Sequence, residues 1–372
     1  RVAQGMYWLL IGTIIVSYGW LTVRRNRDWL NSETLWNVTL ETHPDSPIAL
    51  NNLGLVYANR GEYDRAINLY QYLLLKHPQQ HGIEMVYTNL GDAYMGNEQF
   101  DEALDVYQQA LDYNPEYVGA YLGLARVTTS LRDYANAAQI YQLALDIDPQ
   151  DESVAVQLGR LRFIEGQYDA AITLFQRVID QNPYAMDAYN GLGLCYVNTE
   201  EYDKAYLVYH QALEIEPTST TIRNSLATLY MDQGEFEKAI REFQESLRLE
   251  PENVEVRNNL GMLFLRTGQY ANALQELMET VKRQPDDPRI ISNLGMAYAA
   301  AGLPEQAIEM ARWALEINPD LFLTHVFLGD VCAGTGDFAC AVEAYRQALQ
   351  LQPQNQRVQE KLQAASELLT SP

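Results

Sequence analysis

Two columns of asparagines recur along the chain at a spacing that can bind the backbone of another polypeptide. The first column, in which each member immediately precedes a Leu–Gly pair, is Asn52, Asn89, Asn259 and Asn293, and the second, one position earlier, is Asn51, Asn190, Asn224 and Asn258. A side-chain amide both donates and accepts hydrogen bonds, so a stack of asparagines can hold an extended peptide without reading its sequence. Gly191 and Ser225 interrupt the first column. The same amides can also cap neighbouring helices or bind water, and the pattern leaves both interpretations open.

A pair of arginines offers a second candidate binding site. The interval from Arg126 to Arg160 equals one that recurs throughout the chain, for example from Pro149 to Pro183. Two guanidinium groups at equivalent positions of neighbouring helices would suit a carboxylate or phosphate. The alternative is that each arginine forms an ion pair with a nearby Asp or Glu, which stabilises an exposed site by about 0–1 kcal/mol.

Catalysis and metal binding find little support in the sequence. The chain has no phosphate-binding P-loop, no G-x-S-x-G elbow, no HExxH and no paired-cysteine metal motif. His77 and His81 are followed by a proline and a glycine, respectively, so no helix places both on one face. Cys332 and Cys340 either form a disulfide in an oxidising compartment or remain small buried thiols. We therefore expect a chain that is not an enzyme and that holds no cofactor or metal.

The overall charge points to protein partners. The 26 Lys and Arg residues against 49 Asp and Glu give a formal charge of −23, which repels phosphate backbones and argues against nucleic-acid binding. The 47% of hydrophobic residues excludes a disordered acidic tail.

Prolines mark a repeat that fills most of the chain. They recur at a constant interval, which is slightly longer only between the second and third: Pro44, Pro78, Pro115, Pro149, Pro183, Pro217, Pro251, Pro285, Pro319 and Pro353. An alanine stands at a fixed distance before each closing proline, and a small residue that follows a leucine stands at a fixed distance after most opening prolines. Each unit is expected to form two amphipathic helices joined by a tight turn. The small residue and the alanine should mark where the two backbones approach closely.

This pattern resembles the tetratricopeptide repeat family over residues 47–355, as nine consecutive units. The resemblance implies an all-α fold, a right-handed superhelical solenoid with a concave groove lined by the first helices. Residues 28–46 are expected to form a linker and a half-repeat helix. Residues 356–372 are expected to form a capping helix and tail, because Val358, Leu362, Ala365 and Leu369 make one apolar stripe.

The first 27 residues are expected to form a transmembrane anchor. The stretch from Val2 to Val23 carries no charge, and a helix of that length reaches about 33 Å, enough to cross a bilayer core. Arg24, Arg25 and Arg27 follow it. These cations favour a cytoplasmic array if this is the only span.

The junction after that stretch resembles polytopic membrane proteins that end in tetratricopeptide repeats, including O-mannosyltransferases. The resemblance rests on Arg24-Arg25-Asn26-Arg27-Asp28-Trp29 and Glu33-Thr34-Leu35-Trp36. It implies repeats on the exoplasmic (periplasmic or luminal) side, which we adopt as the expectation over the charge count.

The sequence therefore predicts a membrane-anchored scaffold that mediates protein–protein interaction or assembles a membrane-associated complex. The expected partner is a protein or peptide, bound in the asparagine-lined groove. The alternative function is the acceptor-presenting region of a lipid-linked-sugar-dependent membrane glycosyltransferase. The sequence defines neither the partner nor an oligomeric state.

Overall fold

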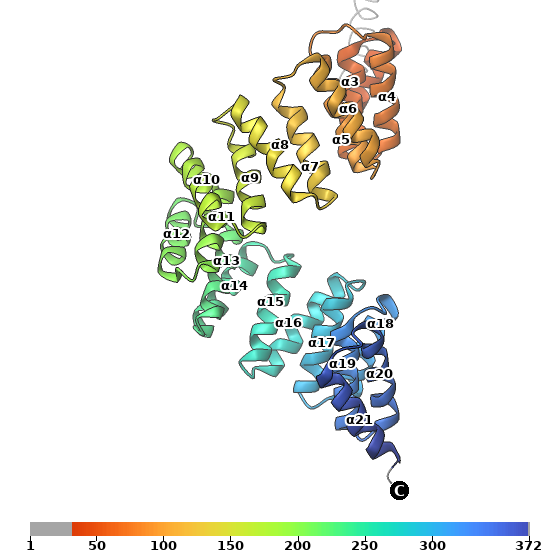
Figure 1. Cartoon of the computed structure of the whole chain (residues 1–372), viewed down its shortest axis with the longest axis vertical. Helices are drawn as coiled ribbons and strands as arrows, with labels where there is room; N and C mark the ends of the chain where they lie inside the picture. Colours follow the sequence, from red (N-terminus) through yellow and green to blue (C-terminus); the bar gives the residue numbers. More distant parts are fainter. Residues whose placement is uncertain (1–31, 371–372) are drawn as a thin grey trace, which may run out of the picture. The chain divides into compact units, whose positions relative to one another are not determined.

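The computed structural model describes residues 32–370, which contain twenty helices and no strands (Figure 1). The predicted all-α repeat fold is confirmed. None of these helices has the length and hydropathy of a membrane span. The anchor expected at residues 1–27, including the stretch from Val2 to Val23, lies outside the described residues.

The helices form successive pairs in the predicted register. The helix before the first pair is α2 (Ser32–Thr42), and the nine pairs are α3 (Pro47–Asn59) with α4 (Tyr63–Lys76), α5 (Ile83–Gly96) with α6 (Phe100–Tyr113), α7 (Val118–Ser130) with α8 (Tyr134–Ile147), α9 (Glu152–Ile164) with α10 (Tyr168–Gln181), α11 (Met186–Asn198) with α12 (Tyr202–Ile215), α13 (Thr220–Asp232) with α14 (Phe236–Leu249), α15 (Val254–Arg266) with α16 (Tyr270–Arg283), α17 (Pro288–Ala300) with α18 (Pro304–Ile317), and α19 (Phe322–Gly334) with α20 (Phe338–Leu351). Helix α21 (Gln356–Thr370) follows the last pair.

The described residues divide into two compact units, with the boundary between Val178 and Ile179 inside α10. Within the second unit three pairs of first helices from successive repeats contact one another: α11 contacts α13, α15 contacts α17, and α17 contacts α19. Side chains at equivalent positions of these contacting first helices can therefore face one ligand.

The alanines that precede each closing proline are all fully buried, as the pattern predicts: Ala66, Ala103, Ala137, Ala171, Ala205, Ala239, Ala273, Ala307 and Ala341. The small residue of the first helix has a different role in most repeats. A Cβ added to Gly193 would lie 2.2 Å from the ring of Tyr209, and one added to Gly54 would lie 2.6 Å from the ring of Tyr70. The close approach is therefore between a first-helix backbone and a second-helix ring.

One repeat does show the backbone approach that the sequence suggested. A Cβ on Gly295 would lie 3.3 Å from the backbone oxygen of Ala307. The second-helix position that carries the ring in other repeats holds an alanine there, Ala311, and the nearest ring is that of Phe327 on α19, at 3.2 Å from such a Cβ.

The turn inside each pair needs one left-handed residue. Six repeats place a glycine there, such as Gly61 with φ 76°, and three place another residue, namely Glu98 (φ 59°), Arg132 (φ 63°) and Glu200 (φ 60°). Glycine adopts this conformation without a steric cost, whereas a side chain with a Cβ does not.

At the carboxyl end, α21 covers the last pair with Val358 and Ala365, each 3% exposed. Leu362 packs beside them at the edge of the same apolar cluster. Leu369 is 49% exposed, so the buried stripe ends one turn earlier than the pattern suggested.

Candidate functional site: a groove along the first helices

Three adjoining pockets run along the first helices of the second unit, and we call them together the first-helix groove. Their volumes are about 410, 510 and 550 Å³. The first and second share Glu255 and Asn259, and the second and third share Arg289 and Asn293. The groove thus extends over α11, α13, α15, α17 and α19.

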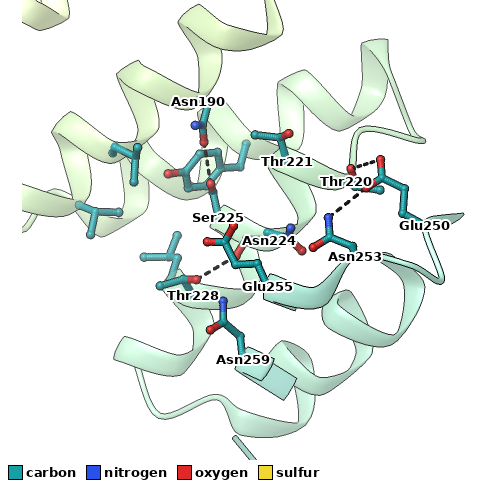
Figure 2. Close-up of a pocket in the computed structure, with 14 residues that line it drawn as sticks. Asn190, Thr220, Thr221, Asn224, Ser225, Thr228, Glu250, Asn253, Glu255 and Asn259 are labelled. Atoms are coloured by element: carbon teal, nitrogen blue, oxygen red, sulfur yellow. Dashed lines mark hydrogen bonds between the residues drawn. The ribbon is translucent and has the colours of Figure 1, made fainter. Parts of the chain in front are cut away.

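The first of these, which we call the asparagine pocket, is lined mainly by amides and hydroxyls (Figure 2). Asn190, Asn224 and Asn259 come from three successive first helices. The Asn224 Oδ1 atom is buried and accepts no hydrogen bond from the described residues. A buried amide oxygen without a donor is costly.

One rim of the asparagine pocket comes from the turn before α15. The Glu250 carboxylate accepts hydrogen bonds from the Thr220 hydroxyl (2.7 Å) and the Asn253 amide (3.0 Å), as Figure 2 shows. These bonds, that from Thr220 first, hold the pKa of Glu250 below its usual range. Glu250 therefore remains charged at the groove edge at neutral pH.

The two predicted asparagine columns are joined to each other across repeat boundaries. The Asn293 amide donates to Asn258 Oδ1 at 2.9 Å, and the Ser225 hydroxyl donates to Asn190 Oδ1 at 2.6 Å. Each bond connects a first-column position to the second-column position of the preceding repeat. The sequence showed the two columns but not this pairing, which depends on how neighbouring first helices are rotated.

The first unit contains one such link and one local bond. The Asn89 amide donates to Asn51 Oδ1 at 2.9 Å, whereas the Asn52 amide donates to the Ile48 carbonyl of its own helix at 2.9 Å. An asparagine has two N–H donors and two acceptor lone pairs, so each linked amide keeps capacity for a further partner.

The arginine pair lies on first helices of the first unit, on α7 and α9. Arg126 and Arg160 are both exposed. Arg126 forms an ion pair with Asp92 (3.2 Å), which also accepts a hydrogen bond from the Tyr107 hydroxyl (2.7 Å). The same arrangement recurs near the carboxyl end, where Asp330 accepts from Tyr345 (2.7 Å) and from Lys361 (2.6 Å). Arg126 thus joins adjacent repeats, as the ion-pair alternative expects.

The third pocket of the groove, which we call the apolar pocket, differs in character. Met296, Leu321, Phe322 and Leu323 line it, and Leu323 is 77% exposed. At its floor the buried hydroxyls of Ser292 and Thr324 hydrogen-bond to each other at 3.0 Å. The groove therefore changes from an amide-rich end to an apolar end.

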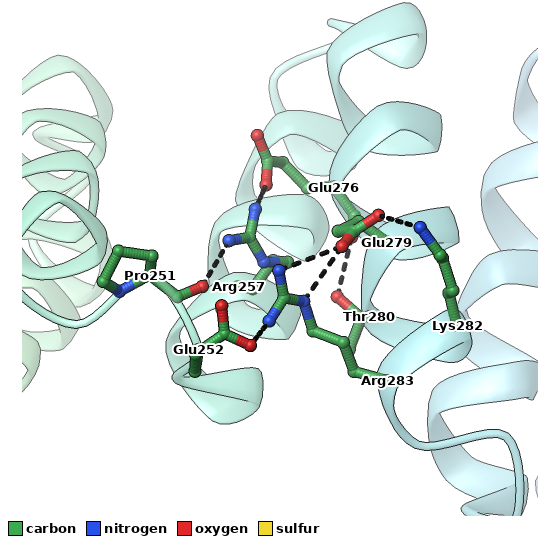
Figure 3. Close-up of polar contacts among 8 residues, drawn as sticks. All are labelled: Pro251, Glu252, Arg257, Glu276, Glu279, Thr280, Lys282 and Arg283. Carbon is green, nitrogen blue, oxygen red and sulfur yellow. Dashed lines mark hydrogen bonds and ion pairs between the residues drawn. The ribbon is translucent and has the colours of Figure 1, made fainter.

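Ion pairs on the other side of α15 position the turn that supplies Glu250 (Figure 3). Arg257 donates to Glu276 (2.7 Å) and to the carbonyl of Pro251 (2.7 Å), and Arg283 pairs with Glu252 and with Glu279 (3.0 Å). A side chain six positions after the closing proline binds its carbonyl in other repeats too: Tyr121, Arg223, His325 and Gln359. Because residues of different types occupy this position, the sequence did not predict this hydrogen bond to the proline carbonyl.

Two further predicted features concern metals and cysteines. Among residues 32–370 no cluster of His, Cys, Asp or Glu could hold a metal ion. Cys332 on α19 and Cys340 on α20 form a disulfide with a Cα–Cα distance of 5.8 Å. Cys195 is a buried free thiol, and burial raises its pKa to about 12.

Comparison with known families identifies the class of this array. A family model described as the cilia and flagella-associated protein 70 C-terminal domain matches residues 142–368, more than half of the chain. The chain belongs to that family. Two tetratricopeptide repeat models also match, at residues 88–152 and 47–80. The repeats of this family member are therefore tetratricopeptide repeats, a class of protein–protein interaction scaffold. No curated protein matches the chain significantly.

Solved structures share the fold. The crystal structure of the APC/C hetero-tetramer Cut9–Hcn1 aligns with a TM-score of 0.52 and 17% identity over 83% of this chain and 59% of that chain, so this family member spans about three fifths of its length. The structure of Pseudomonas aeruginosa PilF aligns with a TM-score of 0.43 and 25% identity, over 49% of this chain and 89% of the PilF chain. The crystal structure of the MamA protein aligns with a TM-score of 0.39 and 21% identity, over 45% of this chain and 92% of the MamA chain.

Proposed function

We propose that the chain is a membrane-anchored scaffold that binds an extended segment of a protein partner in the first-helix groove. The observation that carries the proposal is the asparagine pocket itself, which amides and hydroxyls from three successive first helices line. An extended peptide presents N–H and C=O groups along its length, and these are the groups that an amide ladder satisfies.

The anchor is supported by the uncharged run from Val2 to Val23 and the arginines that follow it. The first-helix groove would then face whichever compartment holds the repeats. The Cys332–Cys340 disulfide favours the exoplasmic side, because disulfides persist in oxidising compartments.

A random dodecapeptide library displayed on phage tests the groove, with the full chain in detergent micelles as the bait. Peptides selected on the chain are synthesised with a fluorophore, and their dissociation constants are measured by anisotropy. The double variant Asn224→Ala, Asn259→Ala should weaken binding by about tenfold, since it removes one or two hydrogen bonds of about 0.5–1.5 kcal/mol each. The matched control is Asn272→Ala, on the second helix α16, where the side chain is exposed.

Stability measurements separate binding from folding in this experiment. Asn224→Ala removes a buried oxygen that has no donor among the described residues, so it should leave the helices at least as resistant to hydrogen exchange as before. Asn258→Ala breaks the link to Asn293 and should speed exchange in α15 and α17. Selected peptides that bind the double variant and the parent chain equally well would contradict the proposed function.

A further inference from the structure

We propose that the segment bound in the first-helix groove is basic and carries a bulky apolar side chain that enters the apolar pocket. The inference rests on the proposed function and specifies the chemistry of the partner. Two independent features of the second unit carry it: the sign of the charge along the groove and the change from amides to exposed hydrocarbon at one end.

The charge along the groove is negative. Glu250, Glu255, Asp287 and Asp320 line its three pockets, against one guanidinium, that of Arg289. Arg289 already pairs with Asp287 at 3.1 Å. The remaining carboxylates face the groove without a further lysine or arginine among its lining residues, so a cationic segment is the complementary ligand.

Other cations of the first helices are directed away from the groove. Arg223 pairs with Glu242 at 2.6 Å, and Arg257 pairs with Glu276 at 2.7 Å, in each case on the second helix of the same repeat. These four side chains are only 15–24% exposed. Their charges are neutralised on the far side of α13 and α15, which leaves the acidic character of the groove uncompensated.

The apolar pocket accepts a hydrocarbon side chain because its polar floor is already satisfied. Ser292 and Thr324 bond to each other and are 8% and 4% exposed, so neither needs a donor or acceptor from a ligand. Above them Phe322, Leu323 and Met296 present apolar surface to solvent. Covering Leu323 with a leucine or phenylalanine would remove apolar area from water on both sides of the contact.

The dodecapeptide library tests this chemistry through the composition of the selected peptides. We expect enrichment in Lys and Arg together with Leu, Ile, Phe or Met, and depletion of Asp and Glu. Affinity should fall by about threefold for Glu255→Gln and about tenfold for Glu255→Lys, the range for loss or reversal of an exposed ion pair. The control Glu309→Gln removes the same charge from the second helix α18 and should leave affinity unchanged.

A variant and a matched control test the contact of the ligand with the apolar pocket. Leu323→Ser should weaken binding by about fivefold or more, because burying part of a leucine contributes on the order of 1 kcal/mol. Leu207→Ser changes another strongly exposed leucine (65%) on the second helix α12 and should have no effect on affinity.

The outcomes distinguish this inference from the function on which it rests. Peptides that lose binding with the Asn224→Ala, Asn259→Ala variant but show no basic or apolar enrichment would overturn the basic–apolar proposal and leave the groove function intact. Peptides that bind Glu255→Lys and Leu323→Ser as tightly as the parent chain would also overturn it. Peptides unaffected by the asparagine double variant would overturn both.

Discussion

The ring of Tyr209 lies directly against the backbone of Gly193, so that a Cβ on this glycine would stand 2.2 Å from the ring. Tyr209 is fully buried, and its ring fills the space between α11 and α12. The same relationship recurs between Gly54 and Tyr70 and between Gly329 and Tyr345. In these repeats the glycine of the Leu–Gly pair makes room for a ring on the second helix, and the two positions fix the spacing of the helix pair.

Gly193→Ala should destabilise the fifth repeat by about 1–3 kcal/mol, because the added methyl group overpacks a filled site. Hydrogen exchange of α11 and α12 amides measures the change locally, which suits an array in which each repeat contacts only its neighbours. Gly334→Ala is the control, since nothing lies within 4 Å of a Cβ there, and alanine should stabilise that helix by up to about 1 kcal/mol. Equal effects of the two substitutions would show that the ring moves aside.

Two equivalent tyrosines should respond to phenylalanine in opposite ways. Tyr107 donates a hydrogen bond to Asp92 at 2.7 Å, so Tyr107→Phe should cost about 1 kcal/mol or more. Tyr70 occupies the same position of the preceding repeat, but its buried hydroxyl has no partner among the described residues. Tyr70→Phe should therefore be neutral or stabilise the first repeat by about 1 kcal/mol. Urea unfolding, followed by hydrogen exchange of the amides of α4 and α6, compares the two variants. A larger loss of stability for Tyr70→Phe than for Tyr107→Phe would contradict the assignment of a hydrogen bond to Tyr107 and of none to Tyr70.

Glu200→Gly should stabilise the fifth repeat by about 0.5–1 kcal/mol. Glu200 has a φ of 60°, a conformation that costs a residue with a Cβ about 1–2 kcal/mol, and the entropic cost of glycine offsets part of the gain. Thermal unfolding of the variant is compared with that of Gly234→Ala, which places the strained residue at the equivalent turn of the next repeat and should lower the unfolding temperature. If neither Glu200→Gly nor Gly234→Ala stabilised the protein, or if both did, the result would contradict the argument that the positive φ strains Glu200.

The periodicity of the sequence predicted most of the fold because each repeat has to bury the same positions. The prolines located the helix pairs, and the alanine ahead of each proline is buried in all nine. The groove was predicted less completely. Asn224 and Asn259 were found by their spacing, whereas the Asn293–Asn258 bond depends on the rotation of one helix against the next. The spacing of residues within a repeat does not predict how one first helix is rotated against the next.

The acidic rim of the groove was missed for a related reason. Glu250 lies in the turn before α15, and turns carry acids throughout this chain, so its residue type conveyed no information. Its role follows from where Thr220 and Asn253 hold its carboxylate. The Arg257 contact to the Pro251 carbonyl, which helps to fix that turn, was likewise visible only in three dimensions.

Reduction of the Cys332–Cys340 disulfide should loosen the carboxyl-terminal end of the array. The bond joins α19 to α20 across a sequence separation of eight, and opening a loop of that size should lower local stability by about 2–3 kcal/mol. Because α21 packs on the same apolar cluster, amides of α19, α20 and α21 should exchange faster after treatment with dithiothreitol, while those of α13 and α14 should not change. A Cys332→Ala, Cys340→Ala variant provides the control and should be insensitive to reductant. Buried Cys195 should resist alkylation in the folded chain throughout, so two thiols that alkylate without prior reduction would show that the pair is open in the native protein.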